Sequence, residues 1–177
     1  FPLIVKPSAE DASIGIDQNS VVHNLVTLKR QIALMEKRYG RPALVEEFIE
    51  GRELYLPLMQ QNGNMRILAI SEIPFHGLPA HLPHIVSFAA KWKPKSVWYR
   101  KTEPVCPTVL SRSLKDKLIR AAKKACAALD VRGYARLDFR VDRRENPFIL
   151  EVNPNPDASL NAGWHHSLEA EGIDYRD

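Results

Sequence analysis

The segment RLDFRVDRRENPFILEVN, residues 136–153, constrains the fold more than any other part of the chain. Polar and apolar residues alternate in both halves, which is typical of strands that bury one face, and the polar run RREN between them predicts a turn. If RREN forms a four-residue loop, Asp138 lies opposite Glu151 and Arg136 lies opposite Asn153, all on one face. The other face carries apolar side chains expected in the core, namely Leu137, Phe139, Leu150 and Val152.

The two facing carboxylates require a compensating positive charge. Opposed strand residues have Cβ atoms about 4.5–5.5 Å apart, so Asp138 and Glu151 repel each other unless a cation lies between them. Mg²⁺ prefers oxygen ligands such as two carboxylates and the amide of Asn153, and substrate phosphates usually complete its shell. This favours a magnesium–nucleotide complex. The alternative is a solvated hairpin face on which Arg136 and Arg140 neutralise the acids.

The rest of the chain predicts short strands and two long helices. Leu3 to Val5 form an expected strand before Pro7, ALVEEFI forms another, and ELYLPLMQ and MRILAI flank an Asn-Gly hairpin signal. One helix is expected to begin at Asn24 or Asn19 and to end at Gly40. Its apolar stripe consists of Leu25, Leu28, Ile32, Met35 and Tyr39.

A second helix is expected after residue 113, where Ser113 and Asp116 resemble a capping box. Its apolar stripe consists of Leu114, Leu118, Ala122, Ala125 and Leu129. The proline-rich stretch from Pro74 to Pro107 shows no clear period and predicts a long irregular loop. Together these elements predict an α+β fold with a largely antiparallel sheet and flanking helices.

Composition excludes several classes of protein. The chain has 177 residues, of which 45% are hydrophobic and 26% charged, so disorder is not expected. Its apolar runs are far shorter than the roughly 20 residues of a membrane span, and two cysteines are too few for a disulfide scaffold. The 25 basic and 21 acidic residues form no clustered stripe that would favour nucleic acid. We therefore expect a cytoplasmic protein without nucleic-acid or membrane partners, and the apolar start at Phe1 suggests that the natural chain begins upstream.

Two further segments suit a nucleotide, although each also has an ordinary structural explanation. Lys6 precedes SAEDASIG, a run of small residues whose backbone amides could bind phosphate oxygens, but a solvated lysine beside a turn fits equally. In VEEFIEGRE, Glu46 and Glu53 bracket Phe48 and Ile49, which suits an adenine pocket with a carboxylate for the ribose. The same acids could simply face water.

Five blocks in order, IVKPSAEDASIG, LVEEFIEGRE, SFAAKW, GYARLDFRVD and FILEVNPNPD, make the chain resemble the ATP-grasp superfamily, in its D-alanine-D-alanine ligase-like branch. The resemblance runs from Leu3 to about Gly172. It implies a partial ATP-grasp fold, in which residues 1–46 are the remainder of a lid subdomain and residues 47–177 bind metal and nucleotide. It also implies that an N-terminal domain of the parent chain is missing here.

The resemblance assigns roles residue by residue. Phosphate contacts would come from Lys6, Ser13 and Lys91; adenine contacts from Glu46, Glu47 and Ile49; and the ribose contact from Glu53. Arg136 and Lys91 would be catalytic, with Arg136 near the reacting acyl phosphate. Asp138, Glu151 and Asn153 would hold magnesium, two ions in all, with Mn²⁺ as a substitute.

The implied activity is that of an ATP-dependent carbon–nitrogen ligase that forms ADP and an acyl phosphate and joins amino acids or short peptides. The isolated fragment could be inactive, and a homodimer is compatible. The chain departs from the branch at Asp11, Ala12 and Asp157, so the substrates stay open. The alternative is a non-catalytic nucleotide-binding remnant with a regulatory or scaffolding role. For the loop with His76, His81 and His84, a place facing substrate is favoured over zinc binding.

Overall fold

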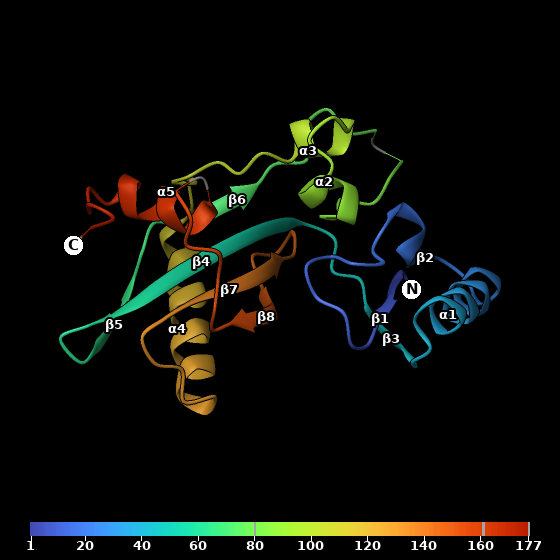
Figure 1. The fold of residues 1–177 in the computed structure, drawn as a ribbon, viewed down its shortest axis with the longest axis horizontal. Coiled ribbons are helices and arrows are strands. Elements are labelled where there is room, and N and C mark those ends of the chain that lie inside the picture. Colours follow the sequence, from blue (N-terminus) through green and yellow to red (C-terminus); the bar gives the residue numbers. More distant parts are fainter. Residues whose placement is uncertain (80, 161, 177) are drawn as a thin grey trace. The chain divides into compact units, whose positions relative to one another are not determined.

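The computed structural model describes residues 1–79, 81–160 and 162–176. The chain forms two compact units, each with its own sheet (Figure 1). The first unit comprises Phe1–Ile49 and Phe75–Glu103, and the second comprises Glu50–Pro74 and Pro104–Asp177. All the strand pairings described below are antiparallel, and helices pack on both sheets, so the predicted α+β class is confirmed.

The first unit contains a three-stranded sheet in the order β2-β1-β3, with one long helix packed on it. Its elements are β1 (Leu3–Pro7), a 3-10 turn η1 (Gln18–Ser20), β2 (Val21–Val22), α1 (Leu25–Tyr39) and β3 (Ala43–Glu47). Helix α1 begins where predicted, because the side chain of Asn24 accepts a hydrogen bond from Thr27 N. It ends at Gly40, whose φ of +64° lies in the left-handed region that glycine tolerates. Val5, Val22 and Met35 form its buried core.

The stretch predicted as one irregular loop contains two short helices in the first unit, α2 (Phe88–Trp92) and α3 (Val97–Lys101). That prediction was wrong in this respect. Each helix has five residues, too few for an apolar period to be visible in the sequence. Their starts carry the missing signal, since Ser87 and Ser96 each accept a hydrogen bond from a backbone N–H in the first turn.

The second unit is built on a five-stranded sheet in which β5-β4-β7-β8 are neighbours and β6 also pairs with β4. Its elements are β4 (Arg52–Gln61), β5 (Asn64–Ile67), β6 (Ser71–Ile73), α4 (Arg112–Ala128), β7 (Tyr134–Val141), β8 (Pro147–Asn153) and α5 (Gly163–Ala170). Helix α4 covers one face of the sheet (Figure 1). The fully buried side chains between them come from β4, β7 and α4, namely Leu54, Leu56, Leu58, Leu114, Leu118, Ala122, Leu137 and Phe139. Because strand side chains alternate, the residues between these on β4 and β7 lie on the opposite face.

Three local features of the second unit are a hairpin turn, a helix cap and a close approach of two strands. The Asn62-Gly63 pair joins β4 to β5 with φ values of +51° and +78°, as predicted for a two-residue hairpin turn. The cap of α4 is Ser111, whose side chain accepts from Leu114 N, so the predicted capping box at Ser113 was wrong by two residues. Gly51 precedes β4 with φ +150°, and a Cβ there would lie 2.0 Å from the carbonyl oxygen of Val141. Only glycine allows this close approach of the two strands.

The hairpin of β7 and β8 has the predicted pairing, with Asp138 opposite Glu151 and Arg136 opposite Asn153. The predicted loop was wrong, because it contains five residues rather than four, and Val141 rather than Asp142 pairs with Pro147. Asp142 folds the turn: its Oδ1 accepts hydrogen bonds from Arg144 N and Asn146 N, each at 2.8 Å.

A β-bulge at Leu150 restores the register of this hairpin. Phe139 pairs with Ile149 and Asp138 pairs with Glu151, so two residues of β8 span one step of β7. Leu150 was predicted to lie in the core, but it is exposed, as are Phe148 and Ile149 before it on β8. The bulge thus decides which β8 side chains join the polar face.

Candidate functional site

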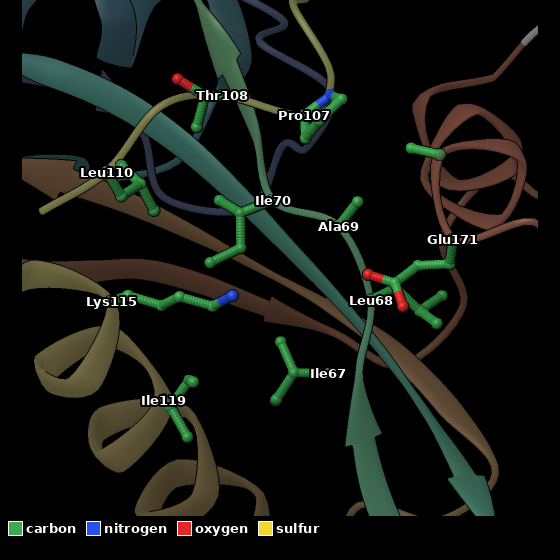
Figure 2. Close-up of a pocket in the computed structure, with 11 residues that line it drawn as sticks. Ile67, Leu68, Ala69, Ile70, Pro107, Thr108, Leu110, Lys115, Ile119 and Glu171 are labelled. Carbon is green, nitrogen blue, oxygen red and sulfur yellow. The ribbon is translucent and has the colours of Figure 1, made fainter. Parts of the chain in front are cut away.

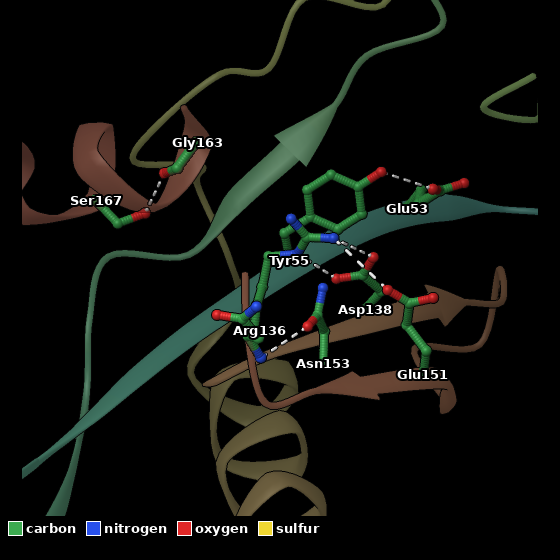
Figure 3. A network of polar contacts seen from close by, with 9 residues as sticks. Glu53, Tyr55, Arg136, Asp138, Glu151, Asn153, Gly163 and Ser167 are labelled. Atoms are coloured by element: carbon green, nitrogen blue, oxygen red, sulfur yellow. Dashed lines mark hydrogen bonds and ion pairs between the residues drawn. The ribbon is translucent and has the colours of Figure 1, made fainter. Parts of the chain in front are cut away.

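The face of the second sheet opposite α4 is a polar surface built by three neighbouring strands (Figure 3). We call this the polar face; its members are Glu53 and Tyr55 on β4, Arg136, Asp138 and Arg140 on β7, and Glu151 and Asn153 on β8. The register places Tyr55, Asp138 and Glu151 in one row across the strands. Pro57, Arg136 and Asn153 form the next row. The strands therefore bring together every second-unit residue that the sequence analysis assigned to the site.

Arg136 and Asp138 form the central contact of the polar face. Arg136 Nε donates to Asp138 Oδ1 at 2.6 Å and Nη2 donates to Oδ2 at 2.9 Å, a two-point ion pair of the strongest type. Glu151 Oε1 lies 3.7 Å from Arg136 Nη2. Burial works to lower the pKa of Arg136, but the hydrogen bonds and charge of Asp138 outweigh it and raise that pKa above the usual arginine value. The guanidinium is thus the cation that offsets the two opposed carboxylates in this structure.

Glu53 is a buried carboxylate with two partners on the same face. Its Oε1 accepts a hydrogen bond from the Tyr55 hydroxyl at 3.0 Å, and its Oε2 lies 3.3 Å from Arg140 Nη1. Burial lowers the pKa of Arg140, and the charge of Glu53 opposes that effect. The pKa of Tyr55 is raised well above 10, first by burial and then by the charge of Glu53. Arg140 thus pairs with Glu53, and Arg136 pairs with Asp138.

The loop after β8 is held by hydrogen bonds that backbone N–H groups donate to amide and carboxylate side chains. Asn155 N donates to Asn153 Oδ1 at 2.9 Å, which fixes the side chain of Asn153 at the end of the strand. Ser159 N donates to Asp157 Oδ1 at 2.9 Å, and this hydrogen bond lowers the pKa of Asp157. The carboxylate of Asp157 is therefore kept in its charged form beside the polar face.

The donor atoms on the polar face suit a hard divalent cation. Asp138 and Glu151 face each other from adjacent strands, and Asn153 adds an amide oxygen, which is the ligand chemistry of magnesium. Among the described residues, no cluster of three or more His, Cys, Asp or Glu side chains could hold a metal ion. The candidate magnesium site differs from such a cluster, because its third ligand is the amide of Asn153. To engage Asp138 through both of its oxygens, an ion has to compete with Arg136.

In the first unit, two predicted nucleotide ligands bind each other. The ammonium of Lys6 on β1 forms an ion pair with Glu46 on β3, whose side chains are 24% and 46% exposed. Both groups thus remain accessible to a ligand. Glu47 is exposed at the end of β3, and Ile49 is half-buried two residues further on.

The loop that carries Ser13 is unusual in its backbone and is tied to α2. Ala12 and Ser13 both have positive φ, +50° and +62°, which is uncommon for residues other than glycine. Trp92 Nε1 donates to Ala12 O at 2.9 Å, and Phe88 N donates to Ile16 O at 2.9 Å. Two anchors therefore hold helix α2 against this loop, and α2 carries the predicted phosphate ligand Lys91.

A cavity of about 530 Å³ lies elsewhere in the second unit, between α4, the segment joining β5 to β6, and the end of α5 (Figure 2). Its walls are both polar and apolar, with Lys115 and Glu171 as the charged members. None of the predicted site residues lines it.

Sequence reasoning missed Tyr55, to which it gave no role, and named Arg140 only in the alternative of a solvated hairpin face. Tyr55 could have been found from its position two residues after Glu53, which places both on one face.

Solved structures of related fold are ligases of the ATP-grasp class. A D-alanine--D-alanine ligase from Bacillus anthracis complexed with ATP matches with a TM-score of 0.69 and 23% identity, over 99% of this chain and 48% of that one. The VanG D-Ala:D-Ser ligase from Enterococcus faecalis matches with a TM-score of 0.71 and 19% identity, over 99% and 46%. At these identities the likeness shows the fold, and the predicted ATP-grasp fold is confirmed.

The chain belongs to the family described as D-ala D-ala ligase C-terminus, whose model matches residues 1–177. A D-alanine--D-alanine ligase of Legionella pneumophila is 32% identical over 181 residues, which cover 100% of this chain and 46% of the relative. The uncharacterized protein y4sG of Sinorhizobium fredii is 31% identical over 175 residues, which cover 99% and 49%. The chain spans about half the length of the curated relatives it matches. Among the described residues, no helix is long and apolar enough to cross a membrane.

Proposed function

We propose that the chain is part of an ATP-dependent carboxylate–amine ligase that forms ADP through an acyl phosphate and joins amino acids or short peptides. The observation that carries the proposal is the pairing of Asp138 with Glu151 beside Arg136 on the polar face. Binding a nucleotide alone does not require an arginine between two metal-binding carboxylates, whereas transfer of a phosphoryl group to a carboxylate does benefit from one. In this proposal residues 1–46 are the remainder of a lid subdomain and residues 47–177 bind nucleotide and metal.

The residues of the chain would act mainly by positioning and by neutralising charge. Lys6, Ser13 and Lys91 would bind the phosphates of ATP. Glu46, with the backbone of Glu47 and Ile49, would bind adenine, and Glu53 would accept hydrogen bonds from the ribose hydroxyls beside the one from Tyr55.

Arg136 would stabilise the charge that develops on the acyl phosphate while an amine attacks its carbonyl carbon and phosphate leaves. Asp138, Glu151 and Asn153 would hold magnesium, which would supply charge neutralisation of the transferred phosphoryl group when bound. The protein groups themselves form no covalent bond in this scheme.

The substrate class is an amino acid or a short peptide. This rests on the family and on relatives whose names are D-alanine--D-alanine ligase, while a solved structure of similar fold is an L-amino acid ligase from Bacillus licheniformis, with a TM-score of 0.60. Asp157 stands in the loop that follows the metal-binding strand, and its charged carboxylate suits the ammonium group of such a substrate.

The test measures ADP release by the full-length parent protein with Mg²⁺, across a panel of D- and L-amino acids and dipeptides. We expect release that depends on one donor and acceptor pair, and we expect Glu151→Gln to abolish it while leaving the circular dichroism spectrum unchanged. Measurable ATP binding without ADP release for any pair would instead favour the non-catalytic nucleotide-binding remnant.

A further inference from the structure

Tyr55 occupies a place on the polar face from which it contacts both arginine-containing pairs. Its ring lies under the guanidinium of Arg136, with 4.7 Å between the ring centroid and Cζ (Figure 3). Its hydroxyl donates to Glu53 Oε1 at 3.0 Å, and Glu53 is in turn paired with Arg140. The hydroxyl of Tyr55 is therefore held by the Glu53–Arg140 pair, and its ring supports the Arg136–Asp138 pair.

The ring contact matters because the other contact of Arg136, its ion pair with Asp138, is open to competition. Asp138 fixes its Nε and Nη2 atoms, but a divalent cation that binds Asp138 competes for the same oxygens. The contact with the ring of Tyr55 does not involve those oxygens and survives such competition, since a cation is attracted to the aromatic face itself. The ring is rigid, because it is buried and its hydroxyl is anchored.

We propose that Tyr55 is a positioning residue for Arg136: its ring holds the guanidinium beside Asp138 and Glu151, and its hydrogen bond to Glu53 fixes the ring. This inference deepens the proposed function, on which it rests for its catalytic consequence. It also couples Glu53, the proposed ribose ligand, to the proposed catalytic arginine through a single side chain. A ligand that binds the carboxylate of Glu53 is thereby linked to the support under Arg136.

The positioning itself is measured on the free protein through the side-chain Nε–H signal of Arg136 in a ¹H–¹⁵N spectrum. In the wild type, the hydrogen bond to Asp138 slows exchange of this proton with water. We expect Tyr55→Leu to accelerate its exchange at least about tenfold and to remove the ring-current shift of the Arg136 side chain. Tyr55→Phe keeps the ring but loses the tether to Glu53, so the signal stays and its exchange accelerates by a smaller factor.

The matched control is Leu56→Val, on the same strand but pointing into the core under α4. It lowers the stability of the unit without touching the polar face, so the Arg136 signal stays as in the wild type. Unchanged exchange in a folded Tyr55→Leu protein overturns the proposal. If that variant does not fold, exchange in Tyr55→Phe equal to the wild type overturns the tether and, with it, the proposal.

The catalytic consequence is tested in the full-length parent through a double-mutant cycle with Arg136→Lys. If Tyr55 acts through Arg136, Tyr55→Leu lowers kcat about 10- to 100-fold with little change in KM for ATP, as expected for a misplaced catalytic group. In the Arg136→Lys background the same change then has little further effect, whereas additive losses contradict the proposal. If Tyr55→Leu alters the exchange of the Arg136 proton but neither the wild-type parent nor any variant releases ADP, the result counts against the ligase function and supports the positioning role of Tyr55.

Discussion

Asp138→Asn tests whether Arg136 is the cation that stabilises the polar face. Asp138 is 4% exposed and the side chain of Arg136 is 18% exposed, so the change leaves a largely buried guanidinium without its two-point partner. Removing one member of a fully buried pair costs about 3–5 kcal/mol. Here Arg136 is partly solvated, keeps the ring of Tyr55 and has Glu151 within 3.7 Å, so we expect a loss of about 2–3 kcal/mol.

The assay is urea unfolding of the 177-residue chain, together with a thermal scan in which the midpoint falls by about 4–12 °C. The matched control is Asp130→Asn, which breaks an ion pair with Arg132 whose side chains are 77% and 78% exposed. Asparagine also tolerates the positive φ of residue 130, so this control should unfold like the wild type. Greater stability in Asp138→Asn would refute the reasoning, because it would mean that repulsion between Asp138 and Glu151 outweighs the pairing with Arg136.

Three further predictions concern features outside this pair. Ser111→Ala removes the side chain that caps α4 at Leu114 N and should lower the free energy of unfolding by about 1 kcal/mol in urea titrations, and an unchanged value would argue against the cap. Hydrogen bonds from Asn146 lower the pKa of Asp142. The contribution of Asp142 to stability is therefore present above the usual carboxyl pKa of about 4 and is lost as the pH falls through the lowered pKa. Asp142→Ala should flatten the acid limb of a curve of unfolding free energy against pH. Burial raises the pKa of Cys106, so its alkylation by iodoacetamide at pH 8 should be slower than that of a free thiol, and an equal rate would contradict the burial.

The sequence predicts the main fold wherever one physical signal dominates. The helix α1, its Asn24 cap and the Asn-Gly turn agree with the structure, because period, cap and turn chemistry favour the same local conformation there. Leu25, predicted in the apolar stripe of α1, is exposed instead. The five-residue helices α2 and α3 are too short for a period and were missed. Helix α5 was missed too, and its N-cap residue, Ala162, makes no side-chain hydrogen bond that would mark the start.

The polar face shows why a correct pairing can rest on an incorrect turn. Alternation alone required Asp138 and Glu151 to share a face, whereas the length of the loop depends on hydrogen bonds of Asp142 that no periodicity reports. The bulge at Leu150 compensates for the longer loop, and a bulge has no sequence signal here, since no glycine is present at it. The partner of Arg140 depends on β4 lying next to β7, which is a long-range pairing that neither strand specifies by itself.

The most direct test of the central claim is Mn²⁺ added at substoichiometric concentration, with ATP, to ¹⁵N-labelled protein. The paramagnetic ion broadens the signals of nuclei close to it, so the account predicts that the amides of Asp138, Glu151 and Asn153 broaden first and that Glu151→Gln suppresses the effect. Addition of Mg²⁺ should restore the signals, because the two ions accept the same oxygen ligands. Broadening that begins at other acidic residues and spares β7 and β8 would contradict the metal-binding role of the polar face.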